Sequence, residues 1–318
     1  MSLAAFRLSS QRLIPIVVRN DIPQDNDSAG FHPAPQVISP DELTRRLPRG
    51  LYTTFSTNHN GTRVLGLSAH LKRLNLPTPA SRADLRLALS QLASANAPGE
   101  SRLRVLVSDS DGTVYVIVQP FAPPAKEIYE RGVRVVTAEL VRTDARRKDS
   151  GFIAASQSQR AQVGGDIYEV LLTRKGMIYE GMTSNFYVVP QTSVCVPPKM
   201  QTEVCVPPKM QTEVCVPPKM QTEVCGTLVT ARTGILLGVT RRVVLRLARG
   251  QGMDIEYRAP RLEEDFAEAF LTSSSRGIVP IVQIDDRRVG QGTVGAWTKR
   301  LSLAYQVYVE ERSEGFVP

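Results

Sequence analysis

The sequence lacks long apolar runs, and it has no cysteine outside one short segment. No apolar stretch approaches the roughly eighteen residues that a membrane-spanning helix needs, so we expect no membrane contact. The four cysteines (Cys195, Cys205, Cys215 and Cys225) recur every ten residues, a spacing typical of neither a zinc ribbon nor a compact disulfide framework. The rest of the fold needs no disulfide, which favours a reducing compartment and predicts a cytoplasmic protein.

Long basic tracts are also missing, although the formal net charge is +8. The arginines stand singly or in pairs, as at Arg45–Arg46 and Arg241–Arg242, and no basic stripe is interleaved with aromatic residues. We therefore expect no nucleic-acid partner. An anionic small-molecule partner explains the positive excess better. The length of 318 residues suits one large domain or two modest ones.

Acidic residues are absent from the first twenty positions, which contain arginines and serines. This composition resembles an organellar transit peptide, but a disordered or loosely attached extension is the favoured interpretation. Residues 20–40 are rich in Pro, Asp, Asn and Ser, which indicates a linker. We assign residues 1–40 to an N-terminal extension and linker.

Extended segments mixed with helices follow, and they predict a small α/β domain over residues 41–120. Residues 50–61 alternate β-formers up to the turn Asn60-Gly61, and a helix after it begins with Ser68 as its N-cap. A second helix covers residues 81–95, and residues 101–121 form a hairpin. The proline-rich residues 121–127 indicate an interdomain linker.

A larger domain is predicted over residues 128–318. Its expected elements are a strand, a helix, a second hairpin turning at Lys175-Gly176, a helix, a buried strand and a C-terminal helix (132–140, 151–163, 166–181, 240–252, 269–275 and from about 298). Hairpins mixed with helices favour an α+β fold over a doubly wound parallel sheet.

A tandem repeat interrupts this larger domain. The decapeptide VPPKMQTEVC occurs three times in residues 196–225. Ten residues with adjacent prolines are too few for a solenoid unit, because known repeats need about twenty or more residues. We interpret the repeat as a duplicated hairpin tip, since loop closure becomes costlier only slowly with length. Metal binding by its cysteines is the alternative, and we assign no metal site.

Four motifs stand in a fixed order: RRKDSGFIAASQSQR, IYEGMTSNFYVV, LLGVTRRVVLRLA and FLTSSSRGIVPI (146–160, 178–189, 236–248 and 270–281). Their order and spacing resemble the class IV, or fold-type IV, pyridoxal 5′-phosphate (PLP)-dependent aminotransferases. That family includes branched-chain and D-amino-acid aminotransferases and 4-amino-4-deoxychorismate lyases. The resemblance runs from about Gly50 to Tyr308 without the repeat. It implies a small N-terminal α/β domain, a larger pseudo-barrel domain and PLP between them.

The resemblance also implies the cofactor residues. Lys148 matches the Schiff-base lysine, whose amine must be unprotonated part of the time. Glu180 matches the glutamate that keeps the pyridine nitrogen protonated, so that the ring can act as an electron sink. Phosphate contacts are implied for an arginine, a helix start and a serine turn (Arg73, Val239, Thr240, Ser274 and Ser275). His70 precedes Arg73 by one helical turn, and we interpret it as a packing or positioning residue.

Substrate recognition follows the family pattern less closely. Arg102 and Arg104 alternate on one strand face, so both can point into a cleft and bind a substrate carboxylate. However, Ser56 stands where many relatives have an arginine. Phe152 stands near the position where some relatives have a tyrosine that bonds the cofactor's ring oxygen. These departures bear on the carboxylate pocket more than on the cofactor site.

The resemblance predicts transamination between an amino acid and a 2-oxo acid in a homodimer. A branched-chain donor with 2-oxoglutarate as acceptor is the best match. Two alternatives remain: β-elimination of the aminodeoxychorismate lyase type, and a non-catalytic relative whose site has decayed.

Overall fold

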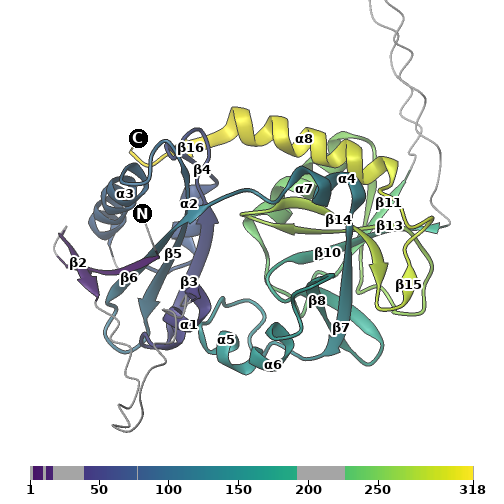
Figure 1. Ribbon diagram of the computed structural model, residues 1–318, viewed down its shortest axis with the longest axis horizontal. Coiled ribbons are helices and arrows are strands. Elements are labelled where there is room, and N and C mark those ends of the chain that lie inside the picture. The colour runs from purple at the N-terminus through teal and green to yellow at the C-terminus, as the bar shows by residue number, and fades with distance from the viewer. Residues whose placement is uncertain (1–2, 10–11, 17–38, 77, 192–225, 318) are drawn as a thin grey trace, which may run out of the picture.

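The computed structural model describes residues 3–9, 12–16, 39–76, 78–191 and 226–317, which form two lobes side by side (Figure 1). The first lobe holds a five-stranded sheet in the order β2-β1-β6-β5-β3, and every neighbouring pair in it is antiparallel. Its strands are β1 (Ala4–Ser9), β2 (Arg12–Ile16), β3 (Gly50–Ser56), β5 (Glu100–Ser108) and β6 (Val114–Phe121).

Two of these strands lie in the segment for which we expected a loose extension. Strand β1 pairs with β2 on one side and with β6 on the other. The prediction is therefore wrong for residues 4–9 and 12–16, because a partner strand a hundred residues away leaves no local signal in the sequence. The linker predicted at 20–40 lies outside the described residues except for its last two positions.

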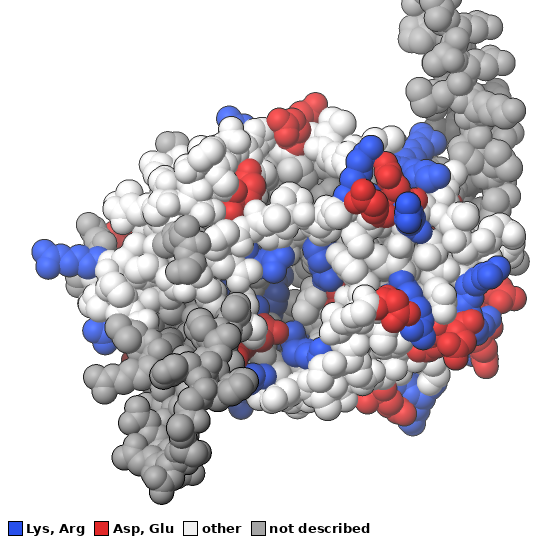
Figure 2. Space-filling view, viewed as in Figure 1, with Lys and Arg blue, Asp and Glu red and all other residues white. Residues whose placement is uncertain are grey.

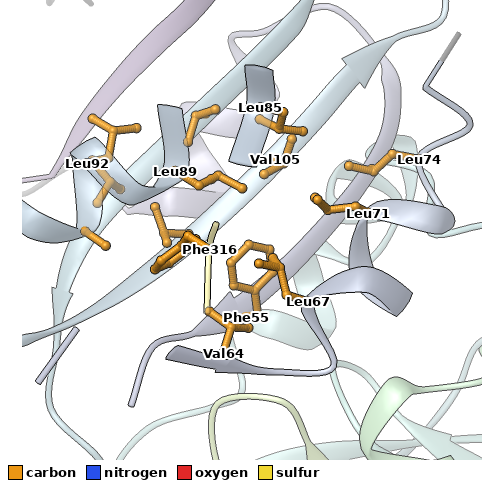
Figure 3. Packing of buried hydrophobic residues seen from close by; sticks show 14 of the residues in the cluster. Phe55, Val64, Leu67, Leu71, Leu74, Leu85, Leu89, Leu92, Val105 and Phe316 are labelled. Atoms are coloured by element: carbon orange, nitrogen blue, oxygen red, sulfur yellow. The ribbon is translucent and has the colours of Figure 1, made fainter. Parts of the chain in front are cut away.

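Three helices cover the first lobe: α1 (Pro40–Arg45), α2 (Leu67–Lys72) and α3 (Pro79–Ser94). Apolar side chains from α2 and α3 pack on the sheet around Phe55, as Figure 3 shows. Ser68 is not the N-cap of α2, since the helix follows Gly66, which has a left-handed φ of 65°. The Ser68 backbone N–H instead donates to Glu314 Oε2 at 3.1 Å.

The second lobe is a barrel-like sheet. Strands β10, β13, β14, β7, β8 and β9 follow one another, and the pairing of Glu180 with Asn185 closes the ring between β9 and β10. Their bounds are β7 (Val133–Glu139), β8 (Ile167–Arg174), β9 (Met177–Gly181), β10 (Asn185–Pro190), β13 (Phe266–Ser273) and β14 (Gly277–Ile284). Strands β11 (Thr227–Thr230), β12 (Asp254–Tyr257) and β15 (Arg287–Arg288) extend the sheet. The expected α+β fold with a barrel-like larger unit is confirmed.

Helices α4 (Lys126–Arg131), α7 (Val239–Gly250) and α8 (Ala296–Arg312) belong to this second lobe. The start of α8 is fixed by the buried carboxylate of Glu268, which accepts hydrogen bonds from the backbone N–H groups of Trp297 (3.0 Å) and Thr298 (2.7 Å). An acceptor at this position satisfies amides that have no partner within the helix.

The end of the chain departs from the predicted domain division. Helix α8 runs from the second lobe to the first (Figure 1), where β16 (Ser313–Gly315) pairs with β4 (Arg63–Leu65). Phe316 is part of the first lobe's core. Residues 313–317 therefore do not belong to the larger unit, which the sequence predicts over 128–318.

The helix predicted at 151–163 is divided into α5 (Gly151–Ala155) and α6 (Gln157–Arg160), which lie between the lobes (Figure 1). The repeat at 196–225 lies outside the described residues. None of the described helices is long and apolar enough to cross a membrane.

Candidate active site

A cavity of about 330 Å³ lies between the two lobes and collects every site residue that the sequence predicted. Figure 2 shows Lys and Arg side chains gathered around a hollow between the lobes. The predicted residues that line the cavity are Arg73, Arg102, Arg104, Lys148, Glu180, Val239, Thr240, Ser274 and Ser275.

Lys148 is held in the cavity by its backbone. Its carbonyl accepts a hydrogen bond from the Tyr52 N–H (2.8 Å), and the Ser150 N–H donates to the carbonyl of Gly50 (2.9 Å), so the segment docks on the edge of β3. The Lys148 Nζ lies 5.0 Å from the centroid of the Tyr52 ring. Burial is the main cause that holds the pKa of Lys148 well below its ordinary value, and the positive charges of nearby arginines, chiefly Arg73, lower it further.

Glu180 lies at the closure of the barrel and is 2% exposed. Its Oε1 accepts from Arg142 Nε at 3.0 Å, and its Oε2 accepts from the Leu236 N–H at 2.9 Å. Burial raises the pKa of Glu180, while Arg142 and the Leu236 amide act in the opposite direction without reversing the shift. Each carboxylate oxygen keeps a lone pair for a further donor.

Arg142 is a site residue that the sequence reasoning missed. Its guanidinium lies 3.7 Å from the centroid of the Phe152 ring and forms the ion pair with Glu180. Phe152, noted as a departure from the family, therefore packs against this arginine. The one sequence signal for Arg142 is its place six residues before Lys148.

A cationic end of the cavity is built around Arg73. The Arg73 Nη2 donates to the carbonyl of Leu237 at 2.8 Å, two residues before α7 begins. The Gly238 N–H donates to Asn185 Oδ1 at 3.2 Å, which ties this start to the barrel. The first amides of α7 have no partner within the helix, so they can bind an anion together with Arg73.

His70 lies at the same end. Its Nδ1 is 2.7 Å from Thr53 Oγ1, and its buried Nε2 has no hydrogen-bond partner among the described residues. Burial and the nearby cations Arg73, Lys148 and Arg242 hold the pKa of His70 well below its ordinary value, so the ring is neutral.

The serine turn lines the cavity from the second lobe. The carbonyl of Ser274 accepts a 3.5 Å hydrogen bond from Ser56 Oγ. Arg276, which the sequence reasoning did not single out, follows the turn and forms a 2.6 Å ion pair with the buried Glu169. Its Nη2 also donates to Thr183 Oγ1 at 2.7 Å.

The two predicted substrate arginines differ in their surroundings. Arg102 stacks over the Phe121 ring at 4.6 Å, and among the described residues it has neither an ion-pair nor a hydrogen-bond partner. Arg104 forms a 2.7 Å ion pair with Asp41 and donates to Thr44 Oγ1, also at 2.7 Å. The Arg102 guanidinium is thus the one available to a ligand carboxylate.

The cavity fits PLP. It supplies a cation with helix-start amides for a phosphate, a buried carboxylate for a ring nitrogen and a lysine amine with a lowered pKa. The buried Nε2 of His70 has no hydrogen-bond partner among the described residues, so it can bond a ligand atom. Among the described residues no cluster of side chains is suited to a metal ion.

The class IV aminotransferase family matches residues 50–207 and 222–284, more than half of the chain. The chain belongs to this family. A branched-chain-amino-acid aminotransferase of Pseudomonas aeruginosa is 26% identical over 80% of this chain and 81% of its own length. A D-alanine aminotransferase of Bacillus licheniformis is 27% identical over 59% of this chain, and the match spans 56% of that enzyme.

The fold agrees with solved structures. A Thermotoga maritima protein, provisionally assigned as a branched-chain amino acid aminotransferase, superimposes with a TM-score of 0.64 at 21% identity and covers 97% of this chain and 96% of its own. Aminotransferases of class IV use PLP as their cofactor. This class IV aminotransferase thus has the expected cofactor and fold.

Proposed function

We propose that this class IV aminotransferase moves an amino group from an amino acid to a 2-oxo acid, with Lys148 as the covalent anchor of PLP. The observation that carries the proposal is the lysine itself. Its amine has a lowered pKa and faces a cavity that also contains the buried Glu180 and the cationic end at Arg73. A neutral amine is what a nucleophile and proton carrier requires.

PLP, when bound, supplies an electron sink for the charge that develops when the substrate Cα loses its proton. The neutral Lys148 Nζ would accept the proton that leaves the substrate Cα and hold it for return during the transfer. Glu180 would hold a proton at the pyridine nitrogen, while Arg142 opposes the rise in the pKa of Glu180 and orients its carboxylate through the 3.0 Å contact.

The residues that would hold the phosphate lie at the end of the cavity where Arg73 meets the start of α7. The Val239 and Thr240 amides are oriented toward an anion by the helix, and the serine turn at Ser274 and Ser275 adds hydroxyl and amide donors. The neutral His70 can add a bond without adding charge.

Substrate carboxylate binding falls to Arg102, whose guanidinium is uncompensated within the described residues. Arg104 lies on the same face of β5 but is paired with Asp41, so it contributes positive charge to this side of the cavity rather than a direct contact. Branched-chain amino acids are the donor that we favour, because the relative with the longer match is a branched-chain-amino-acid aminotransferase. A homodimer is part of the proposal and rests on the family resemblance alone.

The test is spectroscopic and then kinetic. Purified protein incubated with PLP should gain the visible absorption of covalently held cofactor, and Lys148→Ala should not gain it. A branched-chain L-amino acid alone should then convert the protein to its pyridoxamine form. Absence of that conversion with every L- and D-amino acid, together with pyruvate release from aminodeoxychorismate, would favour the lyase alternative.

A further inference from the structure

Asp41 places a carboxylate inside the substrate side of the cavity. It stands at the start of α1 and lines the cavity. Its Oδ1 lies 2.7 Å from Arg104 Nη2, and its Oδ2 lies 2.6 Å from Arg160 Nη1. One carboxylate therefore neutralises two guanidiniums that come from β5 and α6. These ion pairs outweigh burial and hold the pKa of Asp41 below its ordinary value.

The charge balance shows why this carboxylate matters. Arg142 is paired with Glu180 and Arg276 with Glu169, so neither is free for a substrate. Arg102 has no acidic partner among the described residues. Without Asp41, the cavity would offer the guanidiniums of Arg104 and Arg160 beside that of Arg102. The single negative charge of Asp41 compensates one of the two positive charges of Arg104 and Arg160. Both guanidiniums also direct hydrogen bonds to Asp41 instead of to a ligand.

The spacing of the arginines fits a ligand with two carboxylates. Arg102 and Arg104 are two residues apart on β5, so their Cα atoms lie about 7 Å apart on the same face. A short dicarboxylate bound to Arg102 through one end would bring its other end toward Arg104 and Arg160. The Asp41 carboxylate already contacts both of these guanidiniums, and it would repel a second carboxylate brought toward them.

We propose that Asp41 is a specificity-determining residue, an internal carboxylate that masks Arg104 and Arg160 and disfavours dicarboxylic substrates. The protein then prefers monocarboxylic partners with apolar side chains. This inference rests on the proposed transaminase function. It replaces 2-oxoglutarate, the acceptor that the family resemblance suggested, with a monocarboxylic 2-oxo acid.

The test compares acceptors in the PLP-loaded enzyme with one amino donor. We measure kcat/KM for 2-oxoglutarate and for 4-methyl-2-oxopentanoate in wild type and Asp41→Asn. The amide keeps the size of the side chain and removes its charge, so the ratio should shift toward 2-oxoglutarate by about tenfold, mainly through KM. Asp41→Glu retains the charge and should keep a ratio close to wild type.

Glu42→Gln is the matched control. It removes one negative charge from the same helix, but Glu42 does not line the cavity and pairs with Arg46. Its ratio should equal that of wild type. An unchanged ratio in Asp41→Asn, or the same shift in Glu42→Gln, would overturn the proposal.

A binding measurement on the wild type guards against a variant that fails to fold. Glutarate and 4-methylpentanoate are titrated separately into the PLP-loaded protein, and the cofactor absorbance reports Kd. Glutarate should bind at least several-fold more weakly, and tighter binding of glutarate contradicts the mask. This readout needs no turnover. It therefore distinguishes a wrong role for Asp41, seen as tight glutarate binding, from a wrong transaminase proposal, in which no amino acid converts the cofactor.

Discussion

At the scale of one residue, the surroundings of Lys148 make a prediction about stability and pH. Its folded pKa is lower than its unfolded pKa, so between the two values the unfolded chain binds more protons and stability rises with pH. The buried, uncharged Lys148 amine therefore lowers the free energy of unfolding more at pH 7 than at pH 10. In cofactor-free protein, Lys148→Met should raise the free energy of unfolding by about 1 kcal/mol or more at pH 7 and by less at pH 10.

Urea unfolding at several pH values measures this difference. Lys299→Met on the exposed side of α8 removes the same charge from a solvated position, and its effect should not vary in this way. A pH-independent gain in Lys148→Met would mean that the amine is charged in the folded protein.

Arg142 illustrates an ion pair whose loss should affect both stability and chemistry. Arg142→Leu leaves the buried Glu180 without its cation, which typically costs roughly 3–5 kcal/mol and raises the pKa of the carboxyl group further. A protonated Glu180 no longer favours a protonated pyridine nitrogen, so kcat should fall by about tenfold or more.

The double variant Arg142→Leu with Glu180→Gln separates the two effects. It should recover much of the unfolding free energy, because no unpaired charge stays buried, but it should not recover kcat. Recovery of activity in the double variant would show that the pair serves stability alone.

At the scale of one element, the start of α7 depends on Gly238. A Cβ at this position would collide with the Asn185 side-chain oxygen, which also accepts the Gly238 N–H. Gly238→Ala should displace the first turn of α7 and weaken PLP binding by about tenfold, as measured by titration of the absorbance. Gly250→Ala at the other end of the helix meets no atom within 4 Å and should leave the PLP Kd unchanged.

The same scale shows how far the sequence could predict the structure. Hairpins around Asp111-Gly112 and Lys175-Gly176 were predictable, because turn residues and alternating patterns are local signals. The pairing of β1 with β6 was not, since it joins segments more than a hundred residues apart. Ser68 was misjudged as a cap because its contact, Glu314, lies at the other end of the chain.

The site divides in the same way. Lys148 and Glu180 were found because the family motifs surround them, and all nine predicted residues line one cavity. Asp41 and Arg142 were missed because their importance comes from ion pairs across the fold, which a single sequence does not reveal.

At the scale of the whole molecule, the chain closes on itself through α8. The helix leaves the barrel lobe, and Phe316 beyond its end is buried at 4% exposure in the first lobe's core. The backbone carbonyl of Phe316 also accepts a 3.0 Å hydrogen bond from Arg86 Nη1. Because the cofactor cavity lies between the lobes, this attachment links the stability of the first lobe to the geometry of the site.

Phe316→Ala tests that link. Removing a buried phenyl ring should lower the free energy of unfolding by roughly 3–5 kcal/mol, and first-lobe amides should exchange faster with solvent than barrel amides. PLP affinity should fall as well, since Tyr52 and Arg73 belong to the lobe that loosens. Val317→Ala changes a neighbour that is 60% exposed and should alter neither quantity. Hydrogen exchange with and without PLP decides the matter: equal loss of protection in both lobes of Phe316→Ala would mean that the molecule unfolds as one unit.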